Sequence, residues 1–201
     1  MNLFDRVKAI LISPASEWET IKSEPMSIAD MFAKYAAILA AIPAIAGFIG
    51  QSVVGYSVFG THIRIPMVSG IVSAILTYLL SLVTVWVLGI IIDALAPSFG
   101  AQKDQVASTK VAVFSMTATW VAGIFQIIPV LSILGIVGLY SLYLLWVGLQ
   151  KVKEVPQDKM IGYYLLTIVI AIAMYFVVGL LVGLVTWGGH AAAAFNAGMQ
   201  G

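Results

Sequence analysis

The 201-residue chain contains no cysteine and very few charged side chains. Without cysteine, the chain forms no disulfide bond, no catalytic thiol and no thiolate metal site. Charged residues make up only 9% of the sequence, whereas an ordinary soluble domain is about one quarter charged. The net charge of +1 is far from the strongly basic profile of a nucleic-acid-binding protein. These absences indicate an integral membrane protein without a nucleic-acid partner.

Hydrophobic residues account for 61% of the chain, and they form long runs without charge. A transmembrane helix needs about 20 such residues to cross the bilayer. Alternating segments of about 10 residues, which are typical of membrane β-barrels, do not occur in the sequence. The fold class predicted is therefore all-α, a polytopic membrane protein with a five-transmembrane-helix bundle. The predicted spans cover about residues 30–54, 66–92, 106–128, 130–149 and 160–187, within a transmembrane domain of residues 28–187.

The distribution of Lys and Arg predicts the orientation of the chain. Successive segments between the spans lie on alternate sides of the membrane. Nine of the ten Lys and Arg residues fall on one side, and only Arg64 falls on the other. Short cytoplasmic loops are enriched in Lys and Arg. We therefore predict a multi-pass protein of the plasma (inner) membrane, with the N-terminus in the cytoplasm and the C-terminus outside. All nine Asp and Glu residues fall on the same side as the other cations, so that face is expected to be charge-rich but nearly neutral.

Both ends of the chain differ in composition from the spans. Residues 1–27 are predicted to form a cytoplasmic amphipathic segment, with Ser13-Pro14 at the start of its second helix. We expect Trp18 to lie either at the level of the lipid headgroups or against the transmembrane bundle. Ser27 and Asp30 have the spacing of a helix cap at the start of the first span. Residues 188–201 are small and uncharged, and are predicted to form a flexible outer tail.

Ionisable residues at the ends of the spans form the first candidate site, because charge is costly inside a bilayer. Asp93 closes the second span, Lys110 opens the third, and Lys103 lies in the loop between them. If these two spans pack together, Asp93 and Lys110 are at similar depth and can pair. The cluster is expected to be either a structural ion pair at the membrane boundary or a gate or headgroup contact.

Small and hydroxyl-bearing residues recur at every fourth position of several spans, which places them on one helix face. The polar stripe of the second span consists of Ser69, Ser73, Thr77 and Ser81. Gly179 and Gly183 give the fifth span a GxxxG pattern. Such faces allow close helix packing and hydrogen bonds between helices in lipid. They predict either a tight bundle or self-association with another copy of the chain.

The fourth span has an aromatic face, since Tyr140, Tyr143 and Trp146 recur at three-residue spacing. We expect this face to pack between helices or to form a binding wall for a hydrophobic or cationic ligand. His62 and His190 are far apart in the sequence, whereas zinc sites usually have three or four ligands. The sequence contains neither HExxH nor GxSxG, and no phosphate-binding loop. We therefore expect no enzymatic activity, no cofactor and no metal.

Three segments of the chain are distinctive: Leu11-Ile12-Ser13-Pro14 followed by Glu17-Trp18, residues 110–118, and residues 139–149. They resemble the Yip family of Rab-GTPase-interacting membrane proteins and their bacterial relatives. In the second of these segments the family often has tyrosine and proline at the positions of Phe114 and Ala118. The resemblance covers roughly residues 4–184 and implies five spans with a cytoplasmic N-terminus. The short N-terminus is similar to that of the bacterial branch, and the acidic, tyrosine-containing signature of the eukaryotic members is absent, so Rab binding is not implied.

Two functions remain open from the sequence. The first is a non-enzymatic membrane protein that organises membrane lipid or partner proteins, alone or as a homo-oligomer. The second is a transport protein for a small solute, an ion or a lipid, in which the polar stripe of the second span lines the path. In both, the bilayer is the immediate partner, and the sequence identifies no protein partner.

Overall fold

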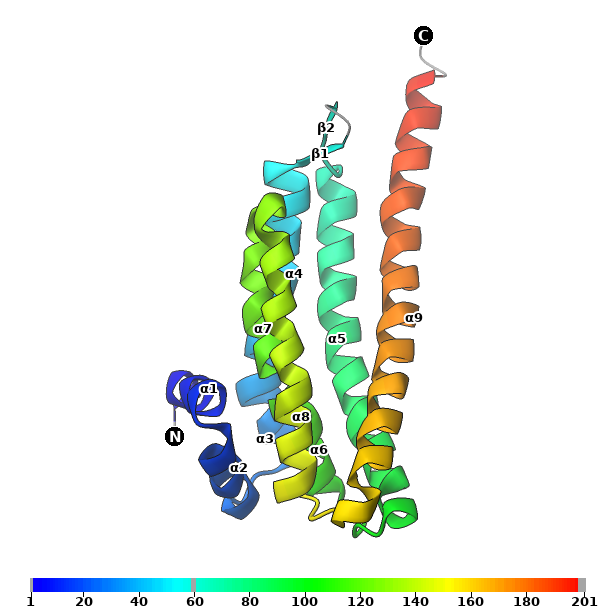
Figure 1. Ribbon diagram of the computed structural model, residues 1–201. Coiled ribbons are helices and arrows are strands. Elements are labelled where there is room, and N and C mark those ends of the chain that lie inside the picture. Colours follow the sequence, from blue (N-terminus) through cyan, green and yellow to red (C-terminus); the bar gives the residue numbers. More distant parts are fainter. Residues whose placement is uncertain (1, 59–60, 199–201) are drawn as a thin grey trace.

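The computed structural model describes residues 2–58 and 61–198, and it describes side chains within residues 2–57 and 61–184. In this part of the chain, five helical segments are long and apolar enough to cross a membrane. They run side by side along the molecule (Figure 1). The spans are Ile28–Val54, Met67–Phe99, Gln105–Ile127, Pro129–Lys151 and Gln157–Leu184. The predicted all-α bundle with five spans is confirmed.

The first half of the chain contains the N-terminal helices and two spans. Helices α1 (Leu3–Ile12) and α2 (Pro14–Ser23) lie beside one end of the bundle (Figure 1). The first span consists of α3 (Ile28–Met31), the π-helical turns η1 (Phe32–Ala36) and η2 (Ile49–Val54), and α4 (Ala37–Phe48) between these turns. The antiparallel strands β1 (Tyr56–Val58) and β2 (Thr61–Ile63) connect it to α5 (Met67–Leu95). We call the end with α1 and α2 the charged end, and the opposite end the hairpin end.

The second half of the chain contains three spans. Its elements are the 3₁₀-helices η3 (Ala96–Phe99), η4 (Gly123–Ile127) and η5 (Pro129–Leu139), and the α-helices α6 (Gln105–Ser115), α7 (Thr117–Ala122), α8 (Tyr140–Lys151) and α9 (Gln157–Gly198). The third and fourth spans turn at Pro129 and form an antiparallel hairpin, as predicted. Helix α9 continues through Gly198, beyond the predicted end of its span at residue 187. Mobility of the tail stays a prediction, and residues 199–201 lie outside the described chain.

Burial differs strongly between the spans. In the most apolar 18-residue stretch of each span, 67% of the third span is buried inside the protein, compared with 6% of the fifth span. Helix α9 is thus peripheral, and between Gln157 and Leu184 most of its side chains are exposed on the outside of the bundle. Close packing around the third span depends on glycine: a Cβ atom on Gly123 would approach the Cβ atom of Pro43 to 2.6 Å. The missing side chain of Gly123 lets η4 lie directly against α4.

The N-terminal helices pack into the core of the bundle. Trp18 of α2 has no exposed surface, and its ring meets Phe114 of α6 edge-on, with 6.3 Å between the ring centroids. Tyr35 of η1 lies on the same phenyl ring, with a centroid separation of 4.6 Å. Of the two positions expected for Trp18, the structure has the one against the bundle. The expected helix cap also forms, since the Ser27 hydroxyl accepts the backbone N–H of Asp30.

Candidate functional site

The predicted pair of Asp93 and Lys110 does not form, because each side chain has other partners. The Asp93 carboxylate accepts the Asp104 backbone N–H at 2.7 Å and the Ser108 hydroxyl at 3.2 Å. The Lys110 ammonium donates to the backbone carbonyls of Lys22 at 3.1 Å and Glu24 at 2.7 Å. These carbonyls lie at the C-terminal end of α2, where the last helical carbonyls lack partners and the helix dipole favours a cation. Lys110 therefore fastens α2 to α6.

Lys153 takes the place at Asp93 that was expected for Lys110. Its ammonium lies 3.7 Å from the Asp93 carboxylate and donates to the Gln102 carbonyl at 2.6 Å. Burial lowers the pKa of Lys153, and the charges of Asp93 and Asp104 oppose this shift. Nothing in the sequence separates Lys153 from its cationic neighbours Lys151 and Lys159. Lys103, which was predicted in the cluster, is exposed in the loop before α6.

Ion pairs attach the N-terminal helices to each other and to the bundle. Arg6 of α1 is 5% exposed and binds Glu17 of α2 at 2.5 Å and also Glu24. Further pairs link Lys22 to Glu154 and Glu19 to Lys151, next to the turn between α8 and α9. We call α1, α2 and these ion pairs the N-terminal clamp. Sequence reasoning missed it because charges on an amphipathic helix are usually solvated.

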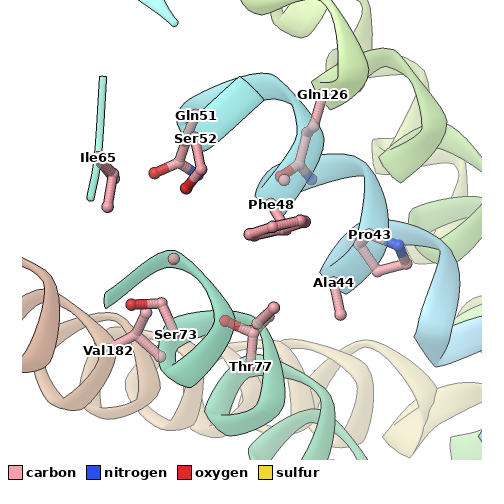
Figure 2. A pocket seen from close by; sticks show the side chains of 13 residues that line it. Pro43, Ala44, Phe48, Gln51, Ser52, Ile65, Ser73, Thr77, Gln126 and Val182 are labelled. Atoms are coloured by element: carbon pink, nitrogen blue, oxygen red, sulfur yellow. The ribbon is translucent and has the colours of Figure 1, made fainter. Parts of the chain in front are cut away.

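A polar cavity lies inside the hairpin half of the bundle, between the first, second, third and fifth spans. It has two adjoining parts of about 70 and 480 Å³, and the larger part opens outward and is lined mostly by apolar surface. Both parts are lined by Pro43, Gln51, Thr77, Gln126 and Val182. Figure 2 shows Gln51 and Ser52 of η2 on one side of the smaller part, and Ser73 and Thr77 of α5 on the other. Gln126 of η4 reaches the cavity from the third span (Figure 2).

The polar stripe predicted on the second span lies largely on this cavity. Ser73 and Thr77 line its smaller part, and Thr77 and Ser81 line its larger part, whereas Ser69 is half-buried and is not among the lining residues. Ser81 also accepts the indole N–H of Trp120 at 3.2 Å. The two glutamines were not predicted as site residues. Both lie beside Gly47, because glycines let the first and third spans approach closely: a Cβ atom on Gly50 would lie 1.9 Å from the Gln126 backbone oxygen.

The predicted aromatic face divides between two environments. Tyr143 is 48% exposed, and its ring centroid lies 5.4 Å from that of Tyr140. Trp146 packs edge-on against Tyr164 of α9, with a centroid separation of 5.1 Å. Trp146 therefore joins the fourth span to the fifth, while Tyr143 faces outward. The structure favours helix packing over a common binding wall for the three rings.

The GxxxG pattern of α9 faces the polar cavity. Gly179 and Gly183 line its larger part, and a Cβ atom added to either glycine would meet no atom within 4 Å. The pattern therefore makes no tight helix contact among the described residues. Among the residues with described side chains, no group of three His, Asp or Glu residues is arranged to hold a metal ion. The side chain of His190 lies outside that part of the chain.

Comparison with known proteins gives one match. The family model described as the Yip1 domain matches residues 8–190, which is most of the chain, including α2, all five spans and the residues that line the polar cavity. No curated protein and no solved structure matches this sequence.

Proposed function

Because the chain belongs to the Yip1 domain family, we propose that it is a non-enzymatic membrane protein that organises membrane lipid or partner proteins through its charged end. It is a multi-pass membrane protein with five candidate spans. The proposal includes a bacterial inner membrane and a cytoplasmic N-terminus. The uneven distribution of Lys and Arg supports the cytoplasmic N-terminus.

The N-terminal clamp is the observation that carries this proposal. Buried Arg6, together with Trp18, fixes α1 and α2 before any partner binds. A surface that is ordered in advance loses less conformational entropy on binding. The outer side of α1 combines exposed Phe4 and Ile12 with the cation Lys8 between them. This stripe suits the surface of an anionic membrane or an amphipathic segment of a partner protein.

Photocrosslinking in intact cells tests the proposed role of α1. With p-benzoylphenylalanine in place of Phe4 or Ile12, we expect protein adducts of defined mass. The same residue in place of Ile172, which is exposed on α9 within the fifth span, is the control and is expected to capture lipid. The protein adducts should disappear when Trp18→Ala is added, because α1 is then no longer held in position. Identical adducts at all three positions would contradict the proposal.

The proposal also includes a homo-oligomeric form. Exposed Val130, Ile133 and Ile136 follow one another at three-residue spacing on η5. Side chains at this spacing lie directly above one another on a 3₁₀-helix, so they form a straight apolar ridge. Light scattering on the protein in detergent, with and without Ile133→Asn, measures whether this ridge joins two copies.

Transport is a second candidate function, because Ser73, Thr77 and Ser81 line the polar cavity. Towards the charged end, however, α5 is closed by Val85, Leu88 and Ile92, which have almost no exposed surface. A path would therefore require α5 to separate from α6 in this half of the bundle.

Flux across liposomes tests the transport function. Ser73→Leu places a large apolar side chain in the cavity and is expected to abolish flux of a small neutral solute if the cavity is part of a path. Ser69→Leu is the matched control, since Ser69 belongs to the same stripe but does not line the cavity. Equal flux through the wild-type protein and both variants would eliminate transport through this cavity.

A further inference from the structure

The polar cavity combines several hydrogen-bonding groups, mainly around its smaller part, with apolar surface and with no charged side chain among its described lining residues. Its walls present carboxamides from Gln51 and Gln126 and hydroxyls from Ser52, Ser73 and Thr77, while Asp, Glu, Lys and Arg are absent from both sets of lining residues. A charged group placed here would lie at membrane depth without a counter-charge, which is strongly unfavourable. Carboxamides both donate and accept hydrogen bonds, as hydroxyls do. The chemistry of the walls therefore selects an uncharged ligand that has hydroxyl or carbonyl groups.

The Ser52 hydroxyl has no hydrogen-bond partner among the described residues. Ser52 is 5% exposed, and its Oγ atom makes no hydrogen bond to the described residues. Buried polar groups nearly always have hydrogen-bond partners, because an unpaired one loses its interaction with water. Ser52 belongs to the wall of the smaller part of the cavity, across from Ser73 (Figure 2). The Oγ atom, however, has almost no surface that a ligand could reach, because it packs against Gly70 of α5, so the groups open to a ligand are the exposed carboxamides of Gln51 and Gln126.

The line along which α5 and α9 pack together, which we call the seam, changes in polarity along its length. The hydroxyls of Ser73 and Thr77 lie within about 15 Å of the start of α5 at the hairpin end, given a rise of 1.5 Å per residue. Further along this seam, an apolar cavity of about 440 Å³ is lined by Leu80, Val83 and the aliphatic side chains of α9. Thr84 and Val178 line both this cavity and the polar one. A lipid in the leaflet at the hairpin end has the same order, polar at the surface and apolar towards the bilayer centre.

We propose that the polar cavity binds an uncharged glycerolipid, of which diacylglycerol is the simplest member. The glycerol hydroxyl and the ester carbonyls would bond to Gln51, Thr77 and Gln126, and the acyl chains would leave along the seam between α5 and α9. The lipid enters from the side, because α9 is peripheral and the GxxxG face of Gly179 and Gly183 leaves open space beside it. This site is separate from the N-terminal clamp, so it does not depend on the function proposed for α1.

Photolabelling of the full chain in phosphatidylethanolamine nanodiscs tests the site. The probe is a diacylglycerol with a diazirine on one acyl chain, and we expect saturable labelling of α5 and α9. Unlabelled diacylglycerol should compete with the probe, whereas phosphatidic acid with the same chains should not, because its phosphate is charged. Labelling that does not saturate, or equal competition by both lipids, would overturn the proposal.

Two sets of variants locate the binding. Gly179→Leu places a side chain in the cavity at a position where an added Cβ atom meets nothing within 4 Å, and it is expected to reduce labelling to background, while Gly135→Leu, at an equally open glycine of η5, should leave it unchanged. Gln51→Met and Gln126→Met should each weaken binding about ten-fold, the loss expected for one good hydrogen bond. Unchanged labelling in Gly179→Leu, or unchanged affinity in both glutamine variants, would refute the site. If Gly179→Leu instead converts a dimer to a monomer, a second copy of α9 occupies this face and the lipid does not. Photocrosslinking from positions 4 and 12 tests the function proposed for the N-terminal clamp, so its outcome does not depend on whether the lipid binds.

Discussion

Replacing Trp18 with alanine is expected to detach α1 and α2 from the bundle. The indole is fully buried between α6 and α8, and its removal leaves a large cavity at the only aromatic anchor of α2. Substitutions of this kind in a core cost about 3–5 kcal/mol. Hydrogen exchange measured by mass spectrometry should show the loss of protection in residues 3–23, while the amides of α5 and α6 stay protected.

Two further variants separate packing from hydrogen bonding at this position. The Trp18 indole N–H has no partner among the described residues, so Trp18→Phe should be much milder than Trp18→Ala. Gly148→Val should reproduce the alanine phenotype from the other side, because a Cβ atom on Gly148 would lie 2.8 Å from the indole ring. Phe4→Ala, at an exposed position of α1, is the neutral control. Unchanged protection of residues 3–23 in both Trp18→Ala and Gly148→Val would show that the indole does not hold the clamp.

Replacing Arg6 with methionine should open the clamp by a different mechanism. The guanidinium pairs with Glu17, which is itself buried, and with the half-buried Glu24. Without Arg6, the carboxylate of Glu17 is left in a poorly solvated place without its counter-charge. Loss of one partner of a buried pair costs about 3–5 kcal/mol. The measurement is again hydrogen exchange of residues 3–23, together with the rate at which a protease removes them.

The double variant Arg6→Met with Glu17→Met provides the decisive comparison. A buried ion pair replaced by apolar side chains of similar size is often neutral or stabilising, so protection should largely return. Lys34→Met is the surface control: its pair with Asp30 is exposed, and such pairs contribute about 0–1 kcal/mol. If residues 3–23 are as poorly protected in the double variant as in Arg6→Met alone, the arginine acts through contacts other than its charge.

The spans were predictable from the sequence, whereas the partners of charged residues were not. Each span is a local property, since a run of about 20 apolar residues needs a helix to satisfy its backbone in lipid. The cap formed by Ser27 and Asp30 is also local, and it is present as expected. The partner of Asp93, in contrast, depends on how the turn after α8 packs against the loop before α6. As partners of Asp93, Lys153 and Lys110 are not distinguished by the sequence, and only the fold shows which one lies next to the carboxylate.

The candidate site shows the same division between local and tertiary information. Helical periodicity placed Ser73, Thr77 and Ser81 on one face, and this face does line the cavity. Periodicity within one helix cannot indicate which other residues complete a cavity. Gln51 and Gln126 are 75 positions apart, and they meet because two spans approach closely at a glycine. The position of Trp18 likewise depends on a depression in α8 above Gly148.

The long 3₁₀-helix of the fourth span affects how this protein fits its membrane. Each residue of a 3₁₀-helix advances about 2.0 Å, compared with 1.5 Å in an α-helix. The 11 residues of η5 therefore reach about 5 Å further than the same residues would in an α-helix. Rewinding η5 would shorten the fourth span by that length, and a mismatch with the hydrocarbon layer costs a fraction of a kcal/mol per ångström. Bilayer thickness therefore affects the winding of this span, and a thinner membrane favours the shorter, α-helical form of residues 129–139.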